Sequence, residues 1–247
     1  MHNKRIARIG SWSIVLTLLC LLTQCGIADL TRHSDAYTFP VQPGTNAWQQ
    51  LGSRQEMLAA VQIPEPQLAQ MSTAGLVETV LQYPLAGDMY AHSSLQRGFN
   101  ALRRDFNGLA ILLDRPDAGR LLLQHYQTID SAAIEAKPTN LEQGAFISSL
   151  QYIETLLAQP EILDQLSSDE RIALLRHVGE QRQIRERLSA IYGISGTASA
   201  AFLAGRILQY EQALQPDDAV AQFLELGSFI NEGVIETIFS AAATYTS

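Results

Sequence analysis

Cysteine is nearly absent from this chain, with only Cys20 and Cys25 among 247 residues. Both lie in the first 28 residues, which we expect to serve as an export segment. The remainder of the chain therefore has no disulfide, no thiolate metal ligand and no cysteine nucleophile. Its stability must come from the packing of non-polar residues, which make up 47% of the sequence.

The sequence motifs of common catalytic and cofactor sites are missing too. HExxH, GxxxxGK[ST], GxGxxG and the EF-hand loop do not occur. The segment 193–196 is one residue short of a nucleophile elbow and follows no predicted strand, so we interpret it as a turn between two helices. The histidines beyond residue 28 are far apart in the sequence: His33, His92, His125 and His177. The sequence thus predicts no metal site and no cofactor.

Positive charge is scarce, because 17 Lys and Arg residues stand against 25 Asp and Glu residues. Removing residues 1–28, which contain Lys4, Arg5 and Arg8 but no acidic residue, changes the formal net charge from −8 to −11. Such a surface repels a phosphate backbone, and no basic stripe with interleaved aromatic residues is present. We therefore expect no nucleic acid partner.

The N-terminus has the pattern of a signal peptide. Three basic residues precede an almost wholly non-polar run of twelve residues, 12–23, which is too short to span a bilayer comfortably. Small residues before Asp29 place a cleavage site after residue 28. Alternatively, residues 22–25 resemble a bacterial lipobox in which Cys25 is the lipidated residue, although Gln24 fits that motif poorly. Both interpretations predict export, with membrane attachment only through Cys25.

Residues 29–46 predict an extended arm or tether, because the segment is polar, contains two prolines and has no helical period. Within it Tyr37, Phe39 and Val41 alternate, which indicates a short strand or an arm packed on the folded body.

Residues 47–247 predict a single all-α domain, because helical periodicity recurs and no strand-like alternation is present. Capping boxes at Ser53 and Ser167 mark two helix starts, and the helix from Ser167 is expected to continue to Tyr192. Four helix starts combine proline with a following acid, which suits the first turn of a helix: Pro64-Glu65, Pro116-Asp117, Pro160-Glu161 and Pro216-Asp217. Their irregular spacing is compatible with an irregular multi-helix bundle and with stacked αα-hairpins.

The most regular stretch is 95–113, which predicts one long helix with a single non-polar face. That face is formed by residues spaced four and three apart: Leu95, Phe99, Leu102, Phe106, Leu109 and Leu113. Asn107-Gly108 interrupts it, since glycine inside a helix costs about 1 kcal/mol relative to alanine. Close approach of a neighbouring helix, or a kink, would explain the glycine.

The best acid–base candidate is Asp88 with His92, which lie four residues apart and would share one helix face. Tyr83 and Tyr90 flank this pair and are candidate binding residues. The simpler interpretation is a capping or surface pair in a short helix.

A series of short stretches between Trp48 and Ile129 carries a resemblance: Gln62-Ile63-Pro64, Met71-Ser72-Thr73, residues 76–81, Tyr83-Pro84-Leu85, Asp88-Met89-Tyr90, residues 106–109 and Asp117-Ala118-Gly119. On these residues the segment resembles a group of exported bacterial proteins of unknown function. The resemblance implies a bacterial source and an exported helical domain, and it supplies no catalytic residues.

Two functions remain open on this basis. The first is a non-catalytic module that binds an unknown protein or peptide at the bacterial cell surface or outside the cell. The second is a hydrolase-like enzyme that uses Asp88 and His92.

Overall fold

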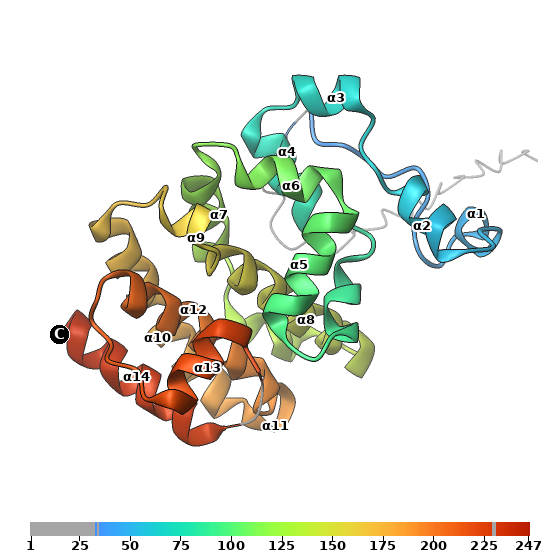
Figure 1. Ribbon diagram of the computed structural model, residues 1–247. Helices are drawn as coiled ribbons and strands as arrows, with labels where there is room; N and C mark the ends of the chain where they lie inside the picture. Colours follow the sequence, from blue (N-terminus) through green and yellow to red (C-terminus); the bar gives the residue numbers. More distant parts are fainter. Residues whose placement is uncertain (1–32, 34, 229–230) are drawn as a thin grey trace, which may run out of the picture. The chain divides into compact units, whose positions relative to one another are not determined.

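The computed structural model describes residues 33, 35–228 and 231–247, and Arg32–Ser247 forms one compact unit. The predicted signal peptide and Cys25 lie outside the described residues. Over the described residues the chain consists of helices, turns and extended linkers without a β-strand (Figure 1). The prediction of an all-α multi-helix bundle is confirmed. Among these residues, no helix combines the length and the non-polar character needed to cross a bilayer.

The first half of the unit contains short helices. They are α1 (Asn46–Gln49), α2 (Arg54–Ala60), α3 (Glu65–Gln70), α4 (Thr73–Leu81), the 3-10 helix η1 (Ala86–Ala91), α5 (Leu95–Asp105), α6 (Asn107–Leu113) and α7 (Ala118–Gln127).

The second half contains the longest helices. They are the 3-10 helix η2 (Ser131–Ala136), α8 (Asn140–Leu157), α9 (Pro160–Leu163), α10 (Ser168–Arg187), α11 (Ser189–Tyr192), α12 (Ser195–Tyr210), α13 (Asp218–Leu226) and α14 (Glu232–Thr246).

Side-chain caps define many of the helix starts, as the sequence indicates. The predicted capping box at Ser167 is complete, because the Ser167 hydroxyl accepts from the N–H of Glu170 and the Glu170 carboxylate accepts from the N–H of Ser167. At Ser53 only half of the box forms. The Ser53 hydroxyl accepts from the N–H of Glu56, while the Glu56 carboxylate accepts from Gly52 instead of Ser53.

The prediction of one helix over 95–113 is wrong, because the chain leaves the helical conformation at Phe106 (φ −129°, ψ 114°). The six residues of the predicted non-polar face are nevertheless all buried, so the two helices α5 and α6 share one core-facing side. The helix expected from Ser167 to Tyr192 is likewise divided, into α10 and α11, at Leu188.

Long-range hydrogen bonds pair polar groups on both sides of Phe106, where the helix is interrupted. The side chain of Asn107 accepts from the N–H of Ile63 (3.1 Å) and donates to its carbonyl (2.8 Å). In return, the Gln62 side chain pairs with the N–H of Asn107 (3.1 Å) and the carbonyl of Asp105 (2.9 Å). A Cβ at residue 108 would collide with the side chains of Ile63 and Phe106, so close approach accounts for this glycine, although Ile63 lies in the linker before α3 and not in a neighbouring helix.

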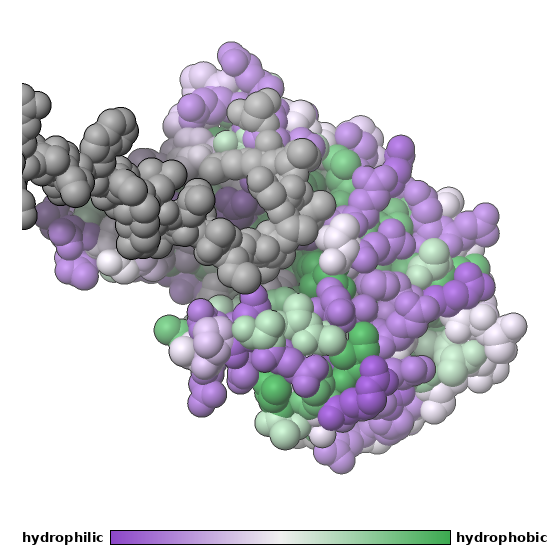
Figure 2. All heavy atoms as spheres, turned by 180° about the vertical axis from the view of Figure 1, so that it is seen from behind, coloured by the Kyte–Doolittle hydropathy of each residue, from purple (hydrophilic) through white to green (hydrophobic). Residues whose placement is uncertain are grey.

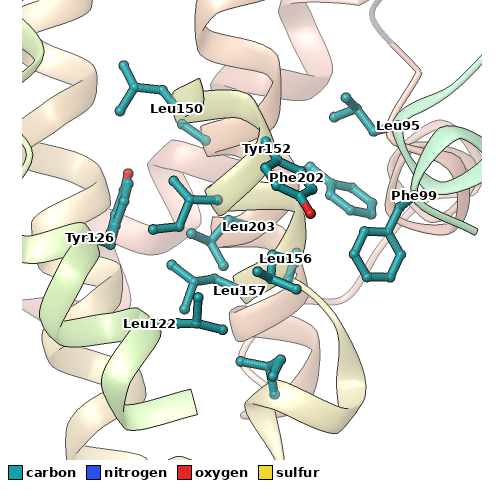
Figure 3. Close-up of a cluster of buried hydrophobic side chains, with 14 of the residues drawn as sticks. Leu95, Phe99, Leu122, Tyr126, Leu150, Tyr152, Leu156, Leu157, Phe202 and Leu203 are labelled. Carbon is teal, nitrogen blue, oxygen red and sulfur yellow. The ribbon is translucent and has the colours of Figure 1, made fainter. Parts of the chain in front are cut away.

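Helix α12 is the most deeply buried element, with α8, α10, α13 and α14 packed around it. Its small residues allow this close packing: Ala198, Ala200, Ala201, Ala204 and Gly205. Helix α8 joins this group to the first half of the unit, because it packs on α5 and α7 as well as on α12. Figure 3 shows side chains from these four helices meeting in one continuous core.

Candidate functional site

Residues 35–39 of the predicted arm lie along α4 without forming a strand. The carboxylate of Asp35 accepts a hydrogen bond from the N–H of Ser72 (2.6 Å), directly before α4. The N–H of Tyr37 donates to the hydroxyl of Thr79 (2.9 Å) in the middle of α4. The bonds from Ser72 lower the pKa of Asp35, so this carboxylate stays charged while the arm is in place.

Phe39 anchors the arm through aromatic contacts. Its ring centroid lies 6.1 Å from that of Tyr83 and 6.1 Å from that of Phe106, and these two body rings stack on each other at 4.0 Å. Phe39 is 4% exposed and is the one buried side chain among the described residues 33 and 35–45.

A further hydrogen bond joins the start of the described arm to α4, since the N–H of His33 donates to the carboxylate of Glu78 (2.9 Å). Burial of a phenylalanine side chain contributes about 1.5–3 kcal/mol, and each hydrogen bond adds about 0.5–1.5 kcal/mol. The arm is therefore held by far fewer contacts than the helices of the core.

We call the surface that receives Asp35, Tyr37 and Phe39 the arm site; its body side is formed by α4, Tyr83 and Phe106. An open hollow borders the arm on each side. One, of about 350 Å³, is lined by Gln42, Gln82 and Pro84 together with arm residues. The other, of about 480 Å³, is lined by Gln67, Gln70 and Met71 together with arm residues. The arm site thus continues beyond its present occupant.

The structure does not bring Asp88 and His92 together. Asp88 forms an ion pair with Arg54, which also lies 4.0 Å from the carboxylate of Asp105. His92 follows the end of η1 in an extended conformation and is exposed. A 3-10 helix has three residues per turn, so residues four apart do not lie above one another as they do in an α-helix. No acid–base pair is formed at this place in the described structure.

The two candidate tyrosines lie near a third, Tyr152 of α8. The hydroxyl of Tyr90 donates to the carbonyl of Ser148 (2.7 Å). The hydroxyls of Tyr83 and Tyr152 are buried without a hydrogen-bond partner among the described residues. Burial raises the pKa of all three phenols above 10, so they stay protonated at neutral pH and do not serve as bases.

A buried ionic centre, which the sequence did not reveal, lies between α7, α8, α10 and α12. The guanidinium of Arg185 contacts both oxygens of Glu154, at 2.5 and 3.2 Å, and both side chains are fully buried. Glu154 also accepts from the hydroxyls of Tyr126 (2.7 Å) and Ser199 (2.5 Å). Arg185 further donates to the hydroxyl of Ser131 (3.0 Å).

This ionic centre is closed to ligands, because each carboxylate oxygen of Glu154 already accepts two hydrogen bonds. We interpret it as a structural device that fixes four helices relative to one another. One signal was present in the sequence, namely an acid inside the non-polar run of α8. Arg185 gave none, since it is one of several arginines on the most charged helix and its partner is 31 residues away.

Other kinds of site find little support. No three His, Cys, Asp or Glu side chains of the described chain gather closely enough to hold a metal ion.

Figure 2 shows a face on which small groups of hydrophobic side chains alternate with hydrophilic ones. The most exposed large hydrophobic residue is Leu141 at the start of α8, at 83%.

Comparison with protein-family models, with curated proteins and with solved structures yields no match.

Proposed function

We propose that this protein is an exported, non-catalytic binding module that recognises a protein or peptide partner at the bacterial cell surface. The observation that supports it most directly is the arm site, where the helical body already holds an extended segment in a hollowed surface. Recognition of extended segments by hydrophobic slots and backbone hydrogen bonds is a common mode of peptide binding.

The alternative, a hydrolase-like enzyme, has less support from the geometry. Its acid, Asp88, is engaged by Arg54, and its base, His92, lies apart from it and exposed. A working acid–base pair needs both groups within hydrogen-bond reach of one substrate.

Site-specific photo-cross-linking in the bacterial host tests the proposal. A photoreactive residue is placed at Gln70 or Gln82, one in each hollow, and as a control at Gln183, which is exposed on α10. We expect the same cross-linked partner from Gln70 and Gln82 and none from Gln183. Equal patterns at all three positions, or no product at any of them, would contradict the proposal.

The export part of the proposal has its own test. Mass spectrometry of the N-terminus of the protein from the host should show a chain that begins at Asp29, or at a lipidated Cys25. Recovery of the chain with Met1 retained in the cytoplasm would rule out export.

A further inference from the structure

The way the arm is bound indicates which chemistry the arm site recognises. Three contacts recur at every second residue: the carboxylate of Asp35, the backbone N–H of Tyr37 and the ring of Phe39. Asp35 lies in a turn closed by a hydrogen bond from the N–H of Ala36 to the carbonyl of His33, and residues 36–39 continue from it outside any helix or turn. From Asp35 onward the spacing fits a chain whose side chains alternate between two sides. The site therefore accepts an acidic residue and, four positions later, an aromatic residue, with a backbone hydrogen bond between them.

The body side of the site is complete without the arm. The hydroxyl of Ser72 accepts from the N–H of Gly75 and so caps α4 by itself. Thr79 donates to the carbonyl of Gly75 while it accepts from the arm. The stacked rings of Tyr83 and Phe106 both belong to the body. Departure of the arm would uncover a formed site.

Gly75 makes the approach of the acidic residue possible. A Cβ at this position would overlap the carboxylate of Asp35 and lie 3.2 Å from the N–H nitrogen of Ala36. The lack of a side chain at Gly75 therefore allows a backbone and a carboxylate to come very close to α4.

We propose that the arm site binds an extended peptide of a partner protein, carrying a carboxylate residue and an aromatic residue four positions later, and that the chain's own arm competes for the same place. This inference rests on the proposed function, since it names the partner's chemistry. The arm is suited to compete because Phe39 is its one buried side chain among the described residues, and because two prolines and Gly44 (φ +86°) separate it from α1.

Competition sets the binding strength that a partner needs. A segment joined by a short linker acts at an effective concentration of the order of millimolar. The affinity of the intact protein for a free peptide is reduced by the small fraction of molecules whose site is open. The two hollows give a longer partner peptide additional contacts that the arm does not use.

The test measures binding of a fluorescent peptide with the sequence of residues 33–43 to the full mature chain by anisotropy. The Phe39→Ala variant weakens the protein's own arm and leaves the body side unchanged. We expect this variant to bind the peptide at least tenfold more tightly than the unmodified protein. The same peptide carrying Phe39→Ala should not bind. Equal binding to variant and unmodified protein would overturn the competition.

Gly75→Ala, added to the Phe39→Ala variant, identifies the place of binding. We expect peptide affinity to fall at least tenfold, because the new Cβ takes the position of the carboxylate. Gly179→Ala is the matched control, since Gly179 lies in α10 with nothing near its Cβ position, and it should leave binding unchanged. Peptide binding that is indifferent to Gly75→Ala would overturn the assigned site.

If Phe39→Ala fails to fold, Asp35→Ala replaces it, because Asp35 is exposed and outside the core.

Two further results test the identity of the occupant. One distinguishes a partner peptide from a second copy of this chain, and the other separates the proposed peptide chemistry from the proposed function. A dimer of the unmodified protein that forms with rising concentration and disappears with Gly75→Ala would make a second copy the occupant and overturn the inference. If cross-linking at Gln70 and Gln82 succeeds while the peptide fails to bind, the proposed function stands and the peptide chemistry is wrong.

Discussion

The ionic centre of Glu154 and Arg185 and the arm site place polar groups in opposite circumstances. At the centre both charges are fully buried and each carboxylate oxygen is used twice. At the arm site a few hydrogen bonds and one phenylalanine hold an otherwise exposed segment. Saturated contacts keep helices in register and leave nothing for a ligand, whereas weak contacts can be exchanged for those of a partner. The difference indicates where binding is to be sought.

Breaking the ionic centre should have the largest effect. Arg185→Met leaves Glu154 buried without its counter-charge, and we expect a loss of about 3–5 kcal/mol in the free energy of unfolding. Urea denaturation followed by circular dichroism measures it. Arg187→Met, at an exposed position of the same helix, is the control and should change stability by less than about 0.5 kcal/mol. The double variant Glu154→Leu/Arg185→Met should recover part of the loss, and full stability of Arg185→Met alone would contradict a structural role for the pair.

Removing one hydroxyl at the centre should have an intermediate effect. In Tyr126→Phe the carboxylate of Glu154 loses a hydrogen bond of 2.7 Å while the ring remains. Hydrogen bonds to charged groups contribute about 1.5–3 kcal/mol, so we expect a loss in this range in the same urea experiment. An unchanged urea midpoint would show that the ionic centre does not need the hydrogen bond from Tyr126 to Glu154.

Acidification should lower stability through two half-buried histidines. Burial lowers the pKa of His125 and of His177 below 6.5. Above pH 6.5 both the folded and the unfolded chain carry neutral histidines, and stability is at its full value. Below pH 6.5 the unfolded chain takes up protons first, so stability falls with pH until the folded pKa is reached. Unfolding at pH 7.5 and 5.5 measures this loss, and a double His125→Gln/His177→Gln variant should reduce it. If the double variant loses as much stability between pH 7.5 and 5.5 as the unmodified protein, other titrating groups cause the loss.

The smallest effect is expected where a hydroxyl has no partner. Tyr152→Phe removes a buried hydroxyl that has no hydrogen-bond partner among the described residues, so stability should stay within about 0.5 kcal/mol or rise. Tyr90→Phe is the comparison, because it loses the bond to the carbonyl of Ser148 and should cost about 0.5–1.5 kcal/mol. A clear loss for Tyr152→Phe would reveal a bound water at that hydroxyl.

The sequence predicted what depends on neighbouring residues. Helix content, the capping box at Ser167 and the buried face from Leu95 to Leu113 all follow from local patterns, and the structure contains them. Asn107-Gly108 left a kink open, but the division at Phe106 could not be predicted, because it depends on groups about 45 residues away, the side chain of Gln62 and the backbone of Ile63. The same holds for Arg185, whose partner lies on another helix.

The candidate site was predicted only in part. Tyr83 was singled out and does belong to the arm site, but through its ring, which stacks on Phe106, and not through acid–base chemistry. The alternation around Phe39 indicated a packed arm. The close approach of the arm to α4 depends on the missing Cβ of Gly75, which a one-dimensional pattern does not connect with Asp35.

The attachment of the arm to α4 also limits how far the body can stand from a membrane. If Cys25 carries a lipid, eight residues separate it from the first described hydrogen bond to the body, at His33, a reach of at most about 29 Å. When the arm leaves α4, the chain is free as far as Thr45, and the reach increases to about 72 Å. Binding of a partner at the arm site would then increase the distance that the helical body can reach from the membrane.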